Sequence, residues 1–377
     1  MLTSVHRQLV GSLVALLCVA ALLTATPTHA AQADRSDSSG ASADGPYVRR
    51  KPGGGFECKR VVADAKGARV EVEALDAARA KFELALPEIS APFTVTLREP
   101  ATAEPARFPA PERVFVLSDI EGNLPALVRL LRAGGVVDAS LRWTFEKGRV
   151  VFLGDLFDRG LQVTECLWVL YELEARAHAA GGAVHFVLGN HEVMNLTGDL
   201  RYVRRKYHEN AALLGEPLEQ LYSSSSVLGQ WLRTRNVALQ LGDELFVHGG
   251  VSPSVAASGA TLEQLNEALR AALAAESGSK PKNNVLALAA GSPEGLIWYR
   301  GYLKAPQIES VELDAVLEKL AVRRIVVGHT VVDDVSFVHG GRVLAVDVHH
   351  ASGHSQAALR DKDGWQRVEA KGARTKL

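Results

Sequence analysis

The sequence predicts an α/β fold, and three features of the chain support that class. Short apolar runs that end at glycine recur along the chain, and runs of this length predict buried strands. Between them lie segments with apolar residues at helical spacing, among them 124–131 and 164–177. With 377 residues, of which 47% are hydrophobic and 23% charged, the chain can form one large domain with an ordinary globular core.

Five of the predicted strands run directly into polar residues of the kinds that bind metal ions. The five polar segments are Asp119-Ile120-Glu121-Gly122-Asn123, Gly154-Asp155-Leu156-Phe157-Asp158-Arg159-Gly160, Gly189-Asn190-His191-Glu192, His248-Gly249-Gly250 and Gly328-His329-Thr330. In a layered α/β protein, the loops that leave the carboxyl ends of buried strands meet at one active site. The resulting set of carboxylate, amide and imidazole groups suits divalent ions such as Mn, Fe or Zn. The sequence therefore predicts a dinuclear metal site for a phosphate ester.

Helices are predicted after the first two polar segments. Pro125 stands at an early helical position, and Gly134-Gly135 ends the first helix. The second covers Thr164–Ala177, and a mostly helical insertion is predicted over 193–237. We interpret this insertion as a cap that helps to choose the substrate, with a solvated basic helix face as the alternative. A sixth strand, Val343–Val346, leads into Asp347-Val348-His349-His350.

In their order, the five polar segments resemble the motifs of the calcineurin-like metallophosphoesterases. The pattern Asp-x-Glu-Gly-Asn, Gly-Asp-x-x-Asp-Arg-Gly, Gly-Asn-His-Glu, His-Gly-Gly, Gly-His-Thr is most similar to the phosphoprotein phosphatase branch, and to its bacterial Shewanella-like members. The resemblance covers Glu112–Val368. It implies a four-layer α/β sandwich, in which helices flank two mixed β-sheets, over a catalytic domain at 112–369.

The resemblance also implies how the polar residues divide between two metal ions. Asp155 would bridge the ions, and the remaining ligands would be Asp119 and Glu121 at the first ion and Asn190, His248 and His329 at the second. Mn is the favoured metal, with Fe, Zn and Mg as alternatives. Two such ions clamp a phosphate ester and lower the pKa of a bridging water, which then attacks as hydroxide.

Glu121 departs from the family pattern, which has histidine at this position. A glutamate can still bind a metal, and its harder anionic oxygen favours Mn or Mg over softer ions. The alternative is that Glu121 only forms hydrogen bonds near the site and that His349 or His350 binds the first ion instead.

A second group of residues would handle the substrate and the leaving group. By resemblance His191 is the general acid, oriented and kept cationic by Asp158. Arg159 and Arg300 would hold the phosphate together with Asn190, because a guanidinium matches two phosphoryl oxygens. Arg300, in Trp298-Tyr299-Arg300-Gly301, matches by order and local context only, so a surface arginine is its alternative. Glu192 is interpreted as a structural carboxylate near backbone N–H groups.

The amino-terminal residues predict export and precede the catalytic domain. Residues 1–30 combine a weakly basic start, an apolar run and small residues up to Ala30, which is typical of a signal peptide. A membrane anchor is the alternative, but the apolar run is short for a span. We therefore expect a periplasmic or secreted protein with no stable membrane insertion after cleavage. Its remaining cysteines, Cys58 and Cys166, are expected to be separate thiols.

The rest of the chain outside the catalytic domain carries no recognisable chemistry. Residues 31–46 predict a disordered linker. Residues 47–111 predict a small β-rich accessory segment, with half-buried strands at Arg69–Glu73 and Phe93–Leu97 and a stiff linker from Pro105 onward. Residues 370–377 are expected to form a tail.

The predicted function is metal-dependent hydrolysis of phosphate monoesters, with phosphoproteins as the expected substrates. Alternatives are hydrolysis of small phosphate esters, nucleotides or phosphodiesters, and a non-catalytic phosphate- or metal-binding protein. Diesterase-type members end in Gly-His-x-His, and Val331 replaces their second histidine here. Pure binding would not require the proton donor His191. The formal net charge of −1 gives no electrostatic case for nucleic acid.

Overall fold

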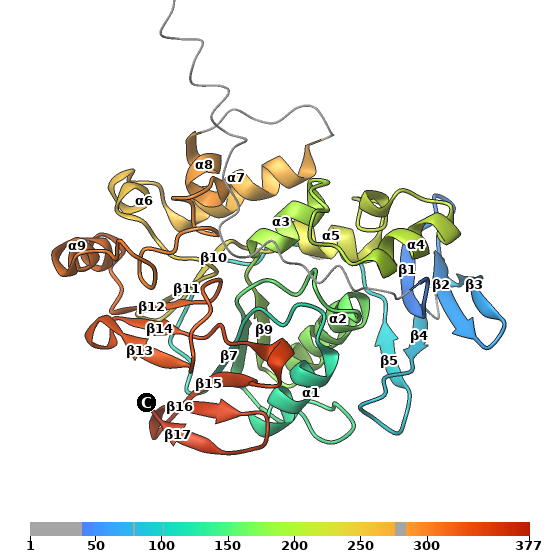
Figure 1. The fold of residues 1–377 in the computed structure, drawn as a ribbon, viewed down its shortest axis with the longest axis horizontal. Helices are drawn as coiled ribbons and strands as arrows, with labels where there is room; N and C mark the ends of the chain where they lie inside the picture. Colours follow the sequence, from blue (N-terminus) through green and yellow to red (C-terminus); the bar gives the residue numbers. More distant parts are fainter. Residues whose placement is uncertain (1–39, 78–79, 101, 276–283) are drawn as a thin grey trace, which may run out of the picture. The chain divides into compact units, whose positions relative to one another are not determined.

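Two six-stranded mixed sheets form the centre of the fold (Figure 1). The computed structural model describes residues 40–77, 80–100, 102–275 and 284–377, which form one compact unit. The strand order is β17-β16-β15-β7-β8-β9 in the first sheet and β13-β14-β12-β11-β10-β6 in the second. The signal-peptide prediction lies outside the described residues.

The first sheet contains the strands behind the first three polar segments. Its parallel strands are β7 (Val114–Leu117), β8 (Arg149–Phe152) and β9 (Ala183–Phe186). Its antiparallel strands are β15 (Gln356–Asp361), β16 (Gly364–Glu369) and β17 (Arg374–Lys376). The prediction of a tail at 370–377 is wrong, because β17 pairs with β16. The side chains of β17 are exposed, so no apolar pattern marked this strand in the sequence.

The second sheet contains the strands behind the last two polar segments. Its strands are β6 (Arg107–Phe108), β10 (Ala238–Leu241), β11 (Glu244–Val247), β12 (Arg324–Val327), β13 (Ser336–Val338) and β14 (Val343–Ala345). The parallel strands β11, β12 and β14 are neighbours. β6 lies in the proline-rich stretch that was predicted to be only a linker, at the edge of the sheet, where neighbouring prolines are tolerated.

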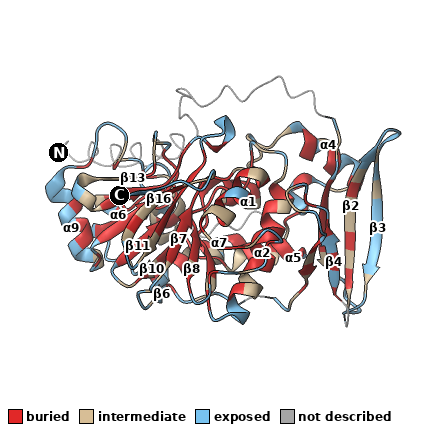
Figure 2. Ribbon diagram, turned by 90° about the horizontal axis from the view of Figure 1, so that it is seen from below, coloured by how far each residue is buried: buried red, intermediate tan, exposed pale blue. Residues whose placement is uncertain are grey.

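Both faces of each sheet are covered, which explains why the strands are apolar throughout. Val116 and Val151 of the first sheet share a buried cluster with Phe246, Val326 and Leu344 of the second. Side chains on the opposite faces of the strands belong to a larger cluster that includes the helices. Figure 2 shows these strands buried along most of their length. The fold is therefore the predicted sandwich of two sheets between helical layers.

The predicted helices are present, and most are short. α1 (Leu124–Ala133) begins with the Asn123 side chain accepting a hydrogen bond from the backbone N–H of Ala126, and it ends at Gly134. The others in the catalytic domain are α2 (Val163–Ala179), α3 (Asn190–Leu196), α4 (Arg205–Leu214), η2 (Leu218–Gln220), α5 (Val227–Arg233), α6 (Pro253–Ala257), α7 (Leu262–Ala274), α8 (Asn284–Ala290), α9 (Ser310–Leu320), η3 (His339–Gly341) and η4 (His350–Ser352). The insertion at 193–237 contains α4, η2 and α5.

The amino-terminal segment forms a three-stranded antiparallel sheet and a hairpin. The sheet contains β1 (Asp44–Arg50), β2 (Phe56–Asp64) and β3 (Gly67–Leu75), and the hairpin contains β4 (Lys81–Leu84) and β5 (Phe93–Thr96). β1 begins inside the range predicted to be a linker. β3 was predicted to be half-buried, but it is an edge strand whose side chains are mostly exposed, with Val72 at 60% (Figure 2).

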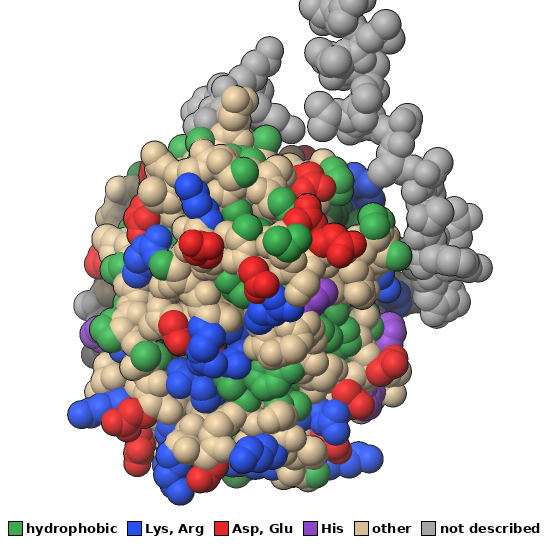
Figure 3. Space-filling model, turned by 90° about the vertical axis from the view of Figure 1, so that its left-hand side faces the viewer, with side chains coloured by type: hydrophobic (Ala, Val, Ile, Leu, Met, Phe, Trp, Pro, Cys, Tyr) green, Lys and Arg blue, Asp and Glu red, His purple; other side chains and the backbone are tan. Residues whose placement is uncertain are grey.

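Other properties of the described residues bear on cysteines and membranes. Cys58 and Cys166 are both free and buried, as expected. Within the described ranges, no helix combines the length and apolar character that a membrane crossing requires. Acidic and basic side chains are interspersed on the face that Figure 3 shows, in keeping with the net charge of −1.

Candidate metal and phosphate site

The polar loops of the two sheets meet in a buried position between the strand ends. In the first sheet, the backbone N–H of Asp119 donates to the carbonyl of Gly154 over 3.0 Å. In the second sheet, the N–H of Gly328 donates to the carbonyl of His248 over 2.8 Å. A third bond joins the sheets, because the N–H of His329 donates to Asp119 Oδ2 over 3.0 Å. The predicted rim is therefore one continuous site.

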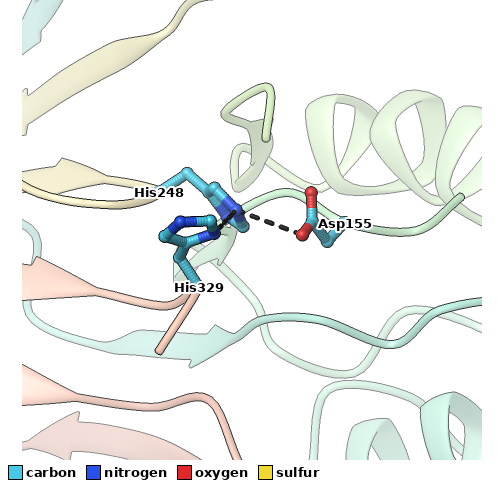
Figure 4. Close-up of side chains that lie close together, drawn as sticks. All are labelled: Asp155, His248 and His329. Atoms are coloured by element: carbon cyan, nitrogen blue, oxygen red, sulfur yellow. Dashed lines mark hydrogen bonds and ion pairs between the residues drawn. The ribbon is translucent and has the colours of Figure 1, made fainter. Parts of the chain in front are cut away.

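Asp155, His248 and His329 form the centre of this site (Figure 4). His248 Nε2 lies 3.2 Å from Asp155 Oδ2 and 3.2 Å from His329 Nδ1. Asn190 Oδ1 lies 3.0 Å from the same nitrogen. All four side chains are buried. One amide, one carboxylate and two imidazoles from separate loops thus direct polar atoms to one point.

The polar atoms around His248 Nε2 show that this point suits a cation. The carbonyl of Leu153 accepts a hydrogen bond from His248 Nδ1, so Nε2 is the ring nitrogen that faces the site. Burial acts to lower the pKa of His248, but the charges of Asp155 and Asp119 raise it to about 10, so the imidazole itself carries the positive charge at this point. Around Nε2 lie a carboxylate oxygen and an amide oxygen, which are acceptors, and the ring nitrogen of His329. In addition, His329 Nε2 is buried and has no hydrogen-bond partner among the described residues. A metal ion would satisfy these lone pairs together.

The charges of the site shift the pKa values of its members in opposite directions. Burial raises the pKa of Asp119 to about 6, and the charge of Asp155 adds to this rise. Burial also acts to raise the pKa of Asp155, but the neighbouring His248 and His191 lower it below its ordinary value. The pKa of His329 is lowered well below its ordinary value by burial and by the charge of His248. The site therefore keeps Asp155 ionised and His329 neutral, as metal binding requires.

Asp347 is a further buried carboxylate at this site, and it was named in the sequence without a role. It follows β14, which lies beside β12 and thus beside Gly328-His329. Its Oδ2 is buried and has no hydrogen-bond partner within the described chain. Burial and the negative charges of Asp119 and Asp155 raise the pKa of Asp347 well above its ordinary value. Its signal in the sequence was its position at the end of a parallel strand.

The backbone of the site adopts conformations that are uncommon for residues with side chains. The described residues include ten non-glycine residues with positive φ, and six of them belong to the site: Asp119, Glu121, Asp155, Asp158, Arg159 and His329. Such conformations persist only where the surrounding structure holds them, and they cluster at functional sites. The strand-exit loops are therefore held by the interactions that they make with one another.

Two motif glycines are required because the loops approach one another closely. A Cβ on Gly154, whose φ is +83°, would lie 2.6 Å from the Cα of Gly189. A Cβ on Gly328 would lie 2.7 Å from Asp119 Oδ2. Both distances are shorter than van der Waals contact, so any side chain here would push the loops apart.

Glu121 and Arg159 form an ion pair with each other. Both side chains are partly exposed, at 22% and 45%, at the edge of the buried centre. Glu121 does not belong to the metal-binding group of Asp155, His248 and His329 that the described residues contain. The alternative ligands do not belong to it either, since His349 is exposed and His350 Nε2 contacts the carbonyl of Ser118 at 3.1 Å.

His191 and Asp158 form a buried pair next to the centre. His191 Nδ1 donates to Asp158 Oδ2 over 2.5 Å, and its Nε2 lies 3.8 Å from Asp155 Oδ2. Burial acts to lower the pKa of His191, but the charge of Asp155 and the hydrogen bond to Asp158 raise it above the ordinary value. The Tyr202 ring lies beside the imidazole at a centroid distance of 5.2 Å. The arrangement fixes the tautomer and favours a protonated ring.

Glu192 holds two of the polar loops together. Its fully buried carboxylate accepts hydrogen bonds from the backbone N–H groups of Asp155, Leu156, Phe157 and Gly189, at 2.7 to 3.3 Å. The predicted structural role of Glu192 is therefore confirmed. Its carboxylate binds N–H groups of a second loop as well as the start of its own helix. It fixes the loop that carries Asp155 against the start of α3.

Arg300 approaches the same site from the second sheet. Its Nη1 donates to the carbonyl of His329 over 2.7 Å and to the Thr330 hydroxyl over 3.3 Å. Trp298 packs edge-on against the His329 ring, with the centroids 5.8 Å apart. Arg300 thus lies at the site and remains exposed to an incoming ligand.

A family model for calcineurin-like phosphoesterases matches residues 112–333, which is more than half of the chain. The chain belongs to this family. Calcineurin-like phosphoesterases are metal-dependent hydrolases of phosphoric esters, and the buried group of Asp155, His248 and His329 agrees with a metal-dependent member.

Among curated relatives of this phosphoesterase is Shewanella-like protein phosphatase 2 of Arabidopsis thaliana. It is 28% identical over 293 residues, which cover 66% of this chain and 73% of the relative. An uncharacterized protein of Schizosaccharomyces pombe is 31% identical over 274 residues, which cover 68% of this chain and 79% of that protein. The structure of the cold-active protein-tyrosine phosphatase of a psychrophilic Shewanella matches with a TM-score of 0.80 and 33% identity, covering 89% of this chain and 100% of that one. The phosphoesterase is therefore similar to the Shewanella-like phosphatases.

The motifs of the phosphoesterase did not reveal every residue that supports its site. Asn195 donates to Asp158 and was not singled out in the sequence, although it lies one helical turn after His191. Tyr202 belongs to the insertion predicted at 193–237 and was given no role of its own, but its ring touches His191 and its centroid lies 5.7 Å from the Arg159 guanidinium. These roles depend on contacts between loops, which a motif alone does not contain.

Proposed function

We propose that this phosphoesterase is a protein phosphatase that acts on phosphotyrosine. The observation that carries the proposal is the buried His191–Asp158 pair, with His191 Nε2 3.8 Å from Asp155. A protein that only binds phosphate does not need a protonated imidazole held at such a point. The similarity to a Shewanella enzyme described as a protein-tyrosine phosphatase supports the substrate class.

The metal ligands of the proposed site are the residues that the sequence suggested. Asp119 and Glu121 would hold the first ion, Asn190, His248 and His329 the second, and Asp155 both. The donor set of oxygen and imidazole nitrogen fits Mn best, with Fe, Zn or Mg as alternatives. When bound, two such ions neutralise phosphoryl charge and lower the pKa of a water molecule. Binding of Glu121 to an ion would also release Arg159 from their ion pair.

The proton for the leaving group would come from His191. Because Nδ1–H donates to Asp158, the second proton of the cationic ring is on Nε2, the nitrogen on the Asp155 side. The raised pKa of His191 keeps this proton bound near neutral pH until the leaving alkoxide or phenoxide takes it.

The phosphate group would be held by Arg159 and Arg300 together with the Asn190 amide. Arg159 comes from the loop after β8 and Arg300 from the side of the second sheet, so they reach the site from different sheets. The Tyr202 ring touches His191, where the leaving group would depart, and offers an aromatic surface to a tyrosyl ring. This position of Tyr202 supports phosphotyrosine over smaller esters.

We also propose that the protein is exported and works in the periplasm or outside the cell. The support is the pattern of residues 1–30, with its apolar run and small residues before position 31. Fractionation of cells that produce the full chain tests this. Recovery of the protein only in the cytoplasm, with residues 1–30 intact, would contradict export.

Turnover on a panel of substrates tests the proposed activity. Peptides with phosphotyrosine, phosphoserine and phosphothreonine, a nucleotide and bis(para-nitrophenyl) phosphate should be compared with Mn and after removal of metal by a chelator. We expect Mn-dependent hydrolysis with phosphotyrosine preferred. Preference for the diester or the nucleotide would refute the protein-phosphatase proposal, and full activity after chelation would refute the metal site.

A further inference from the structure

Asn195 holds the side of the Asp158 carboxylate that His191 does not use. Asp158 Oδ2 accepts from His191 Nδ1, and Asp158 Oδ1 accepts from Asn195 Nδ2 over 3.0 Å. Both donors belong to α3, one helical turn apart and on the same face of the helix. The carboxylate is therefore bound at both oxygens by a single rigid element.

The direction of the Asn195 amide is determined by its partners. Its Nδ2 also donates to the backbone carbonyl of His191 over 2.9 Å. Because the carboxylate and the carbonyl can only accept, the NH₂ group must face both of them. The two N–H bonds of Asn195 are thus both committed, one to Asp158 and one to the helix that carries His191.

This amide matters because the carboxylate is shielded from water. The Asp158 side chain is 1% exposed, and Asn195 itself is 7% exposed. Without the Asn195 donor, Asp158 Oδ1 would lose this hydrogen bond in a place that solvent scarcely reaches, which is costly for a buried acceptor. The carboxylate would then turn to find another donor, and Oδ2 would leave the Nδ1–H of His191.

We propose that Asn195 is a positioning residue that acts through Asp158 on the proton-donating His191. It holds Asp158 Oδ2 against His191 Nδ1–H, and this contact directs the Nε2 proton at the leaving group. The proposal rests on the proposed role of His191 as the general acid. In this proposal Asn195 itself does not contact the phosphate.

Two consequences separate this role from general support of the fold. First, the decrease in kcat on removing the Asn195 amide should depend on the leaving group of the substrate, because a good leaving group needs little protonation. The loss also disappears when Asp158 is already changed, because residues that act through one contact are not additive.

The test compares turnover of Asn195→Leu on phenyl phosphate and on para-nitrophenyl phosphate in the full-length protein with Mn. Leucine is similar in size to asparagine but cannot donate. We expect kcat to fall by about 10-fold on phenyl phosphate and by less than about threefold on para-nitrophenyl phosphate, with KM nearly unchanged. The ratio of the two kcat values does not depend on the fraction of folded enzyme. Equal losses on the two substrates would overturn the proposal.

A double variant and a matched control complete the kinetic test. In an Asp158→Asn background, Asn195→Leu should change the ratio of kcat values no further, and a full additional loss would refute the route through Asp158. Thr197→Ala serves as the control, since Thr197 lies on the cap of the same helix and its hydroxyl donates only to backbone carbonyls of α3. It should leave both kcat values unchanged.

A spectroscopic measurement keeps this inference separate from the proposed function. The His191 Nδ1–H in its 2.5 Å hydrogen bond should give a low-field proton resonance in the intact protein. That resonance should move upfield in Asn195→Leu and stay in place in Thr197→Ala. If it does not move, the positioning role is wrong whatever the substrate. If it moves but wild-type enzyme hydrolyses neither ester, the positioning stands and the proposed phosphatase function fails.

Discussion

The strand-exit loops and the amino-terminal sheet differ in how tightly their polar residues are held. At the loops, Asp155 and His248 are buried and bound by groups from several elements. On β3, Arg69 pairs with Asp64 and Glu71, but all three side chains are about half exposed. Ion pairs of this exposed kind contribute about 0–1 kcal/mol. Charged residues are thus fixed in place at the loops, whereas on β3 their ion pairs contribute little to stability.

The largest expected effect comes from removing the shared carboxylate at the centre of the loops. Asp155→Asn should lower turnover by at least about 10⁴-fold, because it weakens both proposed metal positions and the charge that holds His191 protonated. Metal analysis of the purified variant should show less than the wild-type content. If the variant keeps two ions and most of its activity, the buried charges of the strand-exit loops are no more important than the exposed charges of β3.

His191→Ala should have the next largest effect. Turnover on phenyl phosphate should fall by about 10²–10⁴-fold, the usual contribution of a general acid, and less on para-nitrophenyl phosphate. The comparison of the two substrates checks this directly. Equal losses would mean that His191 acts by holding the metal site instead of donating a proton.

Glu192→Gln tests whether the loops are held as firmly as their contacts suggest. The buried carboxylate accepts from four backbone N–H groups, and an amide cannot accept from all of them. The free energy of unfolding should drop by about 1–3 kcal/mol, as measured by denaturant titration. Unchanged stability would show that the loops hold one another without Glu192.

Glu121→Ala tests a side chain that lies between the buried centre of the site and the solvent-exposed surface. If Glu121 is a ligand of the first ion, the variant should bind Mn more weakly but fold normally, because the side chain lies outside the core. Titration of Mn and metal content measure this, with the exposed His349→Ala as the control. If the variant keeps both ions but its affinity for inorganic phosphate changes, Glu121 is not a metal ligand and acts only through its ion pair with Arg159.

The smallest effect should come from β3. Val72→Thr and Arg69→Ala should each change the free energy of unfolding by less than about 0.5 kcal/mol and leave turnover unchanged, since both side chains are exposed. A loss of activity in either variant would show that the amino-terminal sheet supports the site, and the contrast between the regions would no longer hold.

The sequence predicted best where burial and function impose strong patterns. The strands before Asp119, Asp155, Asn190, His248 and His329 are all present, because buried parallel strands need continuous apolar residues. β6 and β17 were missed because they are short edge strands held by backbone hydrogen bonds. Such bonds do not require particular side chains, so the sequence shows no pattern for these strands.

The contacts of individual side chains were harder to predict than the motifs. The pairing of Glu121 with Arg159 depends on the distance between two loops, and the motifs contain no information about that distance. Asn195 follows His191 by one helical turn, so its place on the same face could be derived, but its bond to Asp158 required the position of another loop. The alternation in β3 indicated the correct strand and the wrong burial, because the residues of an edge strand can alternate although neither face of the strand is well covered.

The bond from the His329 amide to Asp119 Oδ2 spans the seam between the two sheets. A fluctuation that slides one sheet past the other would break this bond and dismantle the site while each sheet kept its own ladder of hydrogen bonds. Activity should therefore be lost at milder denaturing conditions than secondary structure. The hydrogen-exchange rate of the His329 amide proton would report this opening. A metal ion bound by ligands from both sheets would slow the exchange, because it would hold the two sheets together.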